Sequence, residues 1–120
     1  MKKILIVDDE PNIVMTLEYT FKKNNYEVYI ARDGSEALYI LEDVVPDLVL
    51  LDIMMPNVDG YQTLKFIKEK SELKDIKVVF LTAKNKASDV DKGLKLGADK
   101  YLIKPFSIKK IVSEVNELLN

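Results

Sequence analysis

Five polar residues of the sequence each stand where a short apolar run ends, and their chemical types together indicate a site for charged ligands. They are Asp8, Asp9, Asp52, Thr82 and Lys104. If the fold brings them together, the carboxylates repel one another and resist ionisation until a cation neutralises the group. The sequence contains neither histidine nor cysteine. The usual zinc and copper ligands are therefore missing, and the remaining oxygen donors suit hard cations such as Mg²⁺.

The acidic residues also predict how such an ion is held. We expect Asp9 and Asp52 to be direct ligands and Asp8 to act through water, because Mg²⁺ prefers an octahedral shell of oxygens and usually keeps several waters. A bound Mg²⁺ also shields the negative charge of an incoming phosphate from the carboxylates. The sequence therefore predicts a magnesium site that receives a phosphoryl group.

Asp52 is the candidate nucleophile of this site. An ionised carboxylate can attack phosphorus directly and form an acyl phosphate, so the reaction requires no general base. The other groups would stabilise negative charge on the phosphoryl oxygens. The expected donors are the ammonium of Lys104, the hydroxyl of Thr82 and the backbone N–H of Ala83.

Taken alone, several polar residues of the sequence have a simpler structural explanation. Asp8 and Asp9 could cap the helix that Pro11 begins, and Lys104 could be a solvated surface lysine. Tyr101 could be a core aromatic residue. The functional interpretation depends on the whole group meeting at one place.

The elements that must position these residues alternate between short β-rich runs and longer segments of helical period. The expected strands are Ile4–Val7, Val28–Ala31, Leu48–Leu51, Val78–Leu81 and Tyr101–Ile103. Most of them lack polar alternation, as expected where helices cover both faces of a parallel sheet. In such sheets ligands collect beyond the carboxyl ends of the strands, which is where the five polar residues fall.

Apolar stripes at helical spacing follow the strands. The expected helices begin at Pro11, before residue 37, after Gly60, before residue 87 and near residue 108. In the same order, their apolar stripes are Ile13, Val14, Leu17 and Phe21; Ala37, Leu38, Leu41 and Val45; Leu64 and Ile67; Ala87, Val90 and Leu94; and Ile108, Ile111, Val112, Val115, Leu118 and Leu119. Five strands and five helices predict a doubly wound α/β fold.

Composition limits the classes of function. A chain of 120 residues with 48% hydrophobic and 32% charged residues is typical of one globular domain, expected over residues 1–120. The first apolar run is too short for a secretory signal and no run can span a bilayer, so we expect a cytoplasmic protein. The net charge of −2 gives no basic field for direct binding of nucleic acid or membrane.

Four segments carry a resemblance to a known family. Residues 4–11 (ILIVDDEP), 52–60 (DIMMPNVDG), 81–83 (LTA) and 97–106 (GADKYLIKPF) resemble, in order and spacing, the receiver domain of two-component response regulators. The likeness extends over the whole chain. It implies a flavodoxin-like fold with the strand order 2-1-3-4-5 known for this family.

The resemblance also implies a more complete set of site residues. The metal would be Mg²⁺, with Mn²⁺ as a substitute, held by Asp9, Asp52 and the main-chain carbonyl of Met54, with Asp8 assisting. The phosphoryl donor would be the phosphohistidine of a histidine kinase or phosphotransfer protein. The peptide bond between Lys104 and Pro105 is expected to be cis. A chain of this kind is a signalling phosphoacceptor that catalyses only its own phosphorylation and autodephosphorylation.

Activation, by the same resemblance, moves Thr82 toward the phosphoryl group while Tyr101 swings inward. The surface of the fourth helix, fifth strand and fifth helix then changes and controls a downstream protein or an output domain. Met54 and Lys84 occupy positions that tune the phosphoryl lifetime. We expect a monomer, and dimerisation on phosphorylation remains open.

Other functions fit the sequence less well. A flavodoxin-like electron carrier needs donors for the flavin phosphate where Asp8, Asp9 and Glu10 would repel it. A phosphatase with an aspartate nucleophile needs a second acid at the place of Met54. A docking module that never turns over phosphate stays open, as does the choice between a single-domain relay and the receiver of a longer regulator.

Overall fold

The sheet of the protein is built from five parallel strands, seen in a computed structural model that describes all residues from 1 to 120. The strands are β1 (Lys3–Val7), β2 (Glu27–Ala31), β3 (Leu48–Leu51), β4 (Lys77–Thr82) and β5 (Lys100–Ile103). Their order across the sheet is β2-β1-β3-β4-β5. The expected doubly wound fold and its strand order are confirmed.

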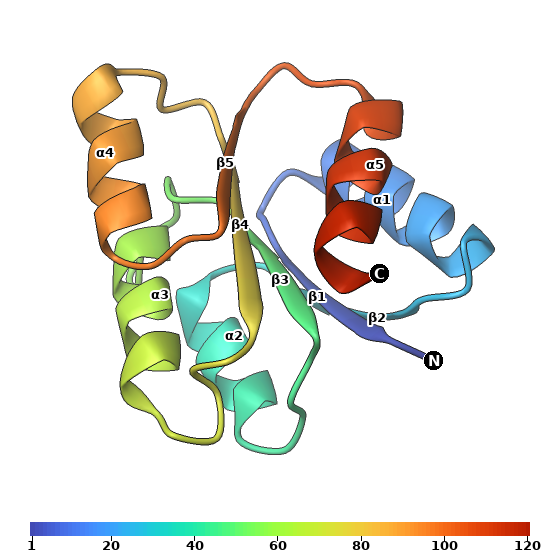
Figure 1. The fold of residues 1–120 in the computed structure, drawn as a ribbon, viewed down its shortest axis with the longest axis horizontal. Coiled ribbons are helices and arrows are strands. Elements are labelled where there is room, and N and C mark those ends of the chain that lie inside the picture. The colour runs from blue at the N-terminus through green and yellow to red at the C-terminus, as the bar shows by residue number, and fades with distance from the viewer.

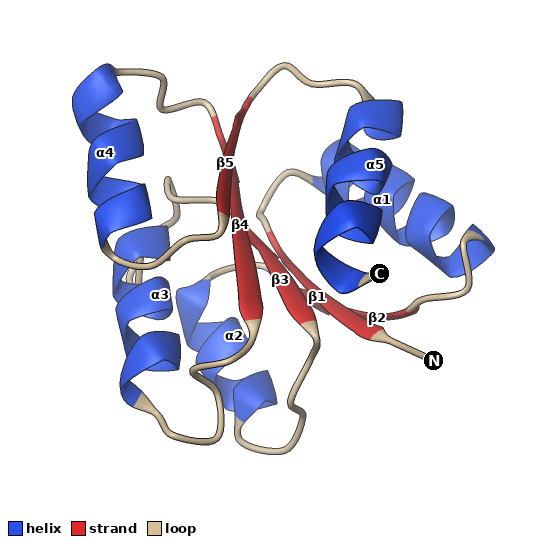
Figure 2. Cartoon of the chain, in the orientation of Figure 1, coloured by secondary structure: helices blue, strands red, loops and turns tan.

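Five helices cover the two faces of the sheet. They are α1 (Pro11–Lys23), α2 (Gly34–Leu41), α3 (Gly60–Glu69), α4 (Ala87–Lys95) and α5 (Ile108–Leu119). Helices α1 and α5 lie on one face, and α2, α3 and α4 lie on the other (Figures 1 and 2).

Alternating residues of each strand supply the two halves of the core, because successive side chains of a strand point to opposite faces. Leu5 and Val7 of β1 belong to a buried cluster with residues of α2 and α3. Ile4 and Ile6 belong to a second cluster with residues of α1 and α5. Burial on both faces explains why these strands are almost wholly apolar.

Two of the predicted apolar stripes differ from the structure. Helix α2 ends at Leu41, and Val45 is 53% exposed, because the residue before Pro46 is disfavoured in a helical conformation. In α4 the stripe residue Leu94 is 47% exposed, and Gly93 is the one buried residue of the helix. Helix α4 is therefore held by other contacts than the predicted stripe.

Strand β4 is one residue longer at its carboxyl end than the sequence predicted. Thr82 is its last residue and pairs with Ile103 of β5. This places Thr82 within the ladder rather than in the loop after it.

None of the helices combines the length and the apolar character needed to cross a membrane.

Candidate phosphoacceptor site

The first residue after each of three strands is still hydrogen-bonded to a neighbouring strand. The N–H of Asp8 donates to Ala31 of β2 at 3.1 Å, that of Asp52 to Val7 of β1 at 2.9 Å, and that of Lys104 to the carbonyl of Thr82 at 2.8 Å. The ladder therefore fixes these backbones at the carboxyl edge of the sheet. Asp8, Asp52 and Thr82 are buried.

Lys104 connects the acids of this edge. Its ammonium lies 2.9 Å from Asp8 Oδ2, 2.7 Å from Glu10 Oε1 and 3.4 Å from Asp52 Oδ2. The lysine side chain is only 10% exposed. Burial alone would lower the pKa of Lys104, but the hydrogen bonds to Glu10 and Asp8 and the charge of Asp52 outweigh it and raise that pKa above its ordinary value. The lysine is thus a fixed positive charge at the centre of the site.

Burial raises the pKa of Asp8 above its ordinary value, although the hydrogen bond from Lys104 and that from the N–H of Glu10 act in the opposite direction. An ion pair normally lowers the pKa of its acid. Burial prevails here because the side chain of Asp8, at 3% exposed, is the most solvent-excluded of the cluster.

Hydrogen bonds and the close approach of α3 fix the position of Asp52. Its Oδ1 accepts the N–H of Met54 at 3.2 Å, and the N–H of Gly60 donates to the carbonyl of Ile53 at 3.1 Å. Helix α3 begins so close to this turn that a Cβ on Gly60 would lie 2.4 Å from the carbonyl oxygen of Asp52. A capping box between Asp59 and Gln62 fixes the start of that helix. The first turn of α3 therefore sets the place of Asp52.

Thr82 stands at the same edge, but its hydroxyl makes no hydrogen bond with Asp52. The Thr82 Oγ1 accepts the N–H of Lys84 at 3.3 Å. Ala83, whose N–H was predicted to face a phosphoryl oxygen, is exposed in the loop after β4.

Tyr101 is half-buried and packs against the core beside the loop that precedes α4. Its hydroxyl donates to the carbonyl of Lys84 at 2.9 Å, and its ring packs on Phe80 with centroids 5.7 Å apart. Burial, with the neighbouring Tyr61 and the charge of Asp89, raises the pKa of Tyr101 above its ordinary value. The side chain is neutral and links β5 to the loop after Thr82.

Three further predicted residues have a clear position. The peptide bond between Lys104 and Pro105 is cis. The side chain of Met54 is 57% exposed. The ammonium of Lys84 lies 3.8 Å from Oδ1 of Asp89 in α4.

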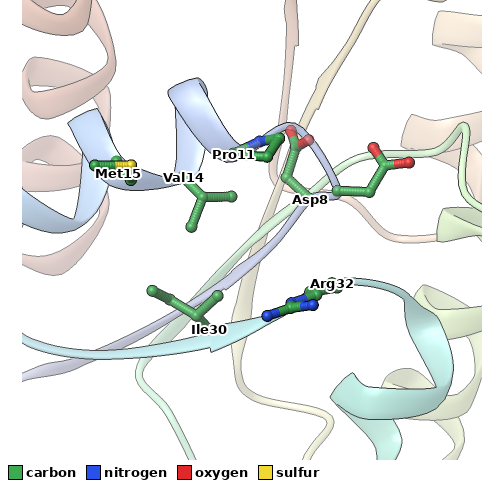
Figure 3. A pocket seen from close by; sticks show the side chains of 7 residues that line it. Asp8, Pro11, Val14, Met15, Ile30 and Arg32 are labelled. Carbon is green, nitrogen blue, oxygen red and sulfur yellow. The ribbon is translucent and has the colours of Figure 1, made fainter.

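The structure groups the acids differently from the sequence prediction. Carboxylate oxygens of Asp8, Glu10 and Asp52 all lie within 4.8 Å of one another. Asp9 is exposed and, together with Asp8, lines a cavity of about 420 Å³. In Figure 3, Arg32 and Ile30 lie across this cavity from Pro11 and Val14 of α1.

Glu10 is the residue of the cluster that sequence reasoning missed. It directly follows Asp8 and Asp9, and its position as a third consecutive acid was the available signal.

The chemistry of this cluster fits a hard divalent cation. Three carboxylates stand against one ammonium, so two negative charges are left without a partner when all three acids are ionised. Oxygen donors of this kind are those that Mg²⁺ and Mn²⁺ prefer.

The sequence and the fold are similar to those of a known protein family. A family model described as the response regulator receiver domain matches residues 4–116. The receiver domain of the Francisella response regulator 1452 is 34% identical, with 98% of this chain and 96% of that chain covered and a TM-score of 0.90. The chemotaxis response regulator CheY4 of Vibrio cholerae is 29% identical, with 98% of both chains covered and a TM-score of 0.92.

A third similar structure is the signal receiver domain of a signal transduction histidine kinase from Syntrophus aciditrophicus. It is 34% identical, with 99% of this chain and 90% of that chain covered and a TM-score of 0.91.

Proposed function

Because the chain belongs to the response regulator receiver family of two-component signalling, we propose that Asp52 accepts a phosphoryl group from the phosphohistidine of a histidine kinase or phosphotransfer protein. The observation that carries this proposal is the contact of the Lys104 ammonium with both Asp8 and Asp52 at the carboxyl edge of the sheet. In this proposal residues 1–120 act as one receiver domain.

The proposed transfer needs one bond to form and one to break. A carboxylate oxygen of Asp52 attacks phosphorus, the bond between phosphorus and the donor's ring nitrogen breaks, and that nitrogen keeps the electron pair. A Mg²⁺ or Mn²⁺ ion held by Asp8, Asp9, Asp52 and the Met54 carbonyl would supply charge neutralisation for the incoming phosphate.

The other residues of the site stabilise charge on the phosphoryl oxygens. Lys104 is already directed at Asp52, so its ammonium needs only a short movement to reach an oxygen bound there. The Thr82 hydroxyl would exchange its bond with the Lys84 N–H for a bond to the phosphoryl group, and the N–H of Ala83 would donate beside it. Met54 and Lys84 at the rim would tune how fast water removes the group.

The signal would leave through α4, β5 and α5. Thr82 and Tyr101 are both linked to Lys84, the first through its N–H and the second through its carbonyl. A shift of Thr82 would therefore move Lys84, and with it the hydrogen bond to Tyr101 and the start of α4. Phosphorylation would bias the protein between two packings of this surface, which a downstream protein or output domain reads.

A phosphorylation experiment tests the proposal. The protein is incubated with a small phosphodonor, with and without Mg²⁺, and its intact mass is measured. We expect a metal-dependent gain of one phosphoryl group that Asp52→Asn abolishes. Asp75→Asn, at an exposed position, should behave as the wild type. A wild type that gains no phosphoryl group would favour a docking module instead.

A further inference from the structure

The ammonium of Lys104 has more acidic partners than its proposed task requires. An ammonium carries three N–H donors and accepts no hydrogen bond. Here they face Glu10 at 2.7 Å, Asp8 at 2.9 Å and Asp52 at 3.4 Å. Every donor is therefore engaged before a phosphoryl group arrives, and the shortest bond goes to Glu10, which the proposed transfer does not use.

The three partners differ in how easily they can release the lysine. The side chains of Asp8 and Asp52 are 3% and 6% exposed, whereas that of Glu10 is 54% exposed. A buried carboxylate that loses its cation remains uncompensated, which is strongly unfavourable. An exposed carboxylate is hydrated as soon as it leaves, so its ion pair contributes little. Glu10 is the partner that can leave.

We propose that Glu10 competes with the phosphoryl group on Asp52 for the ammonium of Lys104, and so limits how tightly the site holds that group. This inference rests on the proposed function. A phosphoryl group brings up to two negative charges into the cluster, and a carboxylate on the same ammonium repels it. The side chain of Glu10 therefore rotates outward into solvent when the phosphoryl group binds, and Lys104 donates to a phosphoryl oxygen instead.

The substitution Glu10→Gln separates charge from shape. It retains the length of the side chain and an oxygen that can accept from Lys104, but it removes the negative charge through which Glu10 competes with the phosphoryl group. The site should then hold a phosphoryl group more tightly, by about fivefold, the upper range for one exposed ion pair. The difference should shrink at high salt, because an exposed charge is screened.

The experiment measures the affinity for beryllofluoride, a phosphoryl mimic, by ¹⁹F NMR at saturating Mg²⁺. Wild type, Glu10→Gln and Glu18→Gln are compared at low and high salt. Glu18 is the matched control, because it carries the same charge on α1 but pairs with Lys22 instead of Lys104. We expect tighter binding in Glu10→Gln alone, with the gap narrowing as salt is added.

Equal or weaker binding of beryllofluoride by Glu10→Gln would overturn the inference. If the weaker binding came with a loss of Mg²⁺ affinity, measured from the effect of Mg²⁺ on thermal unfolding, Glu10 would be a metal ligand instead. A wild type that binds no beryllofluoride would instead remove the proposed function and this inference with it.

Discussion

Lys104 and Asp8 form an ion pair 2.9 Å long with side chains that are 10% and 3% exposed. The pair joins residues 96 positions apart and lies against the phosphoacceptor candidate Asp52. A buried acid depends on its partner, since removal of one member of a buried pair leaves the other charge uncompensated. The stability of the fold therefore depends on which charged groups the site contains.

Removal of the lysine should expose this dependence. In Lys104→Met we expect the free energy of unfolding without Mg²⁺ to fall by about 3 kcal/mol, and added Mg²⁺ to restore part of it. Lys95→Met is the control, because Lys95 is 77% exposed in its pair with Asp91, and it should show no measurable change. Urea unfolding measures both variants. An equal loss in the two would refute the dependence.

Asp8 should make stability depend on pH. Its folded-state pKa is raised, chiefly by burial, so the folded protein binds this proton more tightly than the unfolded chain does. Stability then falls as the pH rises from the ordinary aspartate value of 3.8 through the folded-state pKa. Asp8→Asn should therefore be more stable than the wild type at neutral pH.

Urea unfolding at a series of pH values, without Mg²⁺, measures this effect. The gap between Asp8→Asn and wild type should close as the pH falls through the folded-state pKa to 3.8, while exposed Asp75→Asn should follow the wild type throughout. A gap that stays constant with pH would show that Asp8 is not the titrating group.

Gly60 should be intolerant of any side chain. A Cβ there would lie 2.4 Å from the carbonyl oxygen of Asp52 and 2.6 Å from Cα of Ile53, and backbone atoms cannot move aside as a flexible side chain can. We expect Gly60→Ala to lower the free energy of unfolding by about 2 kcal/mol and to slow phosphorylation by displacing Asp52. Full stability with unchanged phosphorylation would contradict the close approach.

Tyr61 should hold α4 in place. Its hydroxyl donates to the carbonyl of Asp89 at 3.1 Å, and the ammonium of Lys92 lies 4.2 Å from its ring centre. Tyr61→Phe removes a bond worth about 1 kcal/mol, so amide hydrogen exchange in α4 should become about fivefold faster. Tyr19→Phe, at an exposed position of α1, should leave it unchanged. Unaltered exchange in both would show that the hydroxyl does not anchor α4.

The sequence predicts the sheet and its site edge well because both follow from local patterns. Apolar runs such as those ending at Val7 and Leu51 are buried on both faces, and parallel crossovers bring their carboxyl ends to one edge. Asp8 and Asp52 follow these runs directly, so their meeting at that edge required no knowledge of side-chain contacts.

The packing of α4 could not be predicted in this way. Its apolar stripe indicated burial of Leu94, but the helix rests on Phe80 and Tyr101 through Gly93, where a Cβ would lie 3.1 Å from each ring. Such close packing depends on side chains from other elements, and the spacing of apolar residues within one helix carries no information about them. The bond of Glu10 to Lys104 was missed for the same reason, since it joins residues 94 positions apart.

Borohydride reduction of the phosphorylated protein would locate the phosphoryl group, which we propose that Asp52 carries. Reduction converts an aspartyl phosphate to homoserine, and peptide mass mapping then locates the change. We predict conversion at Asp52 alone, in a peptide that remains unmodified when Mg²⁺ is withheld. Conversion at Asp8, Asp9 or another acid, with Asp52 intact, would contradict the assignment.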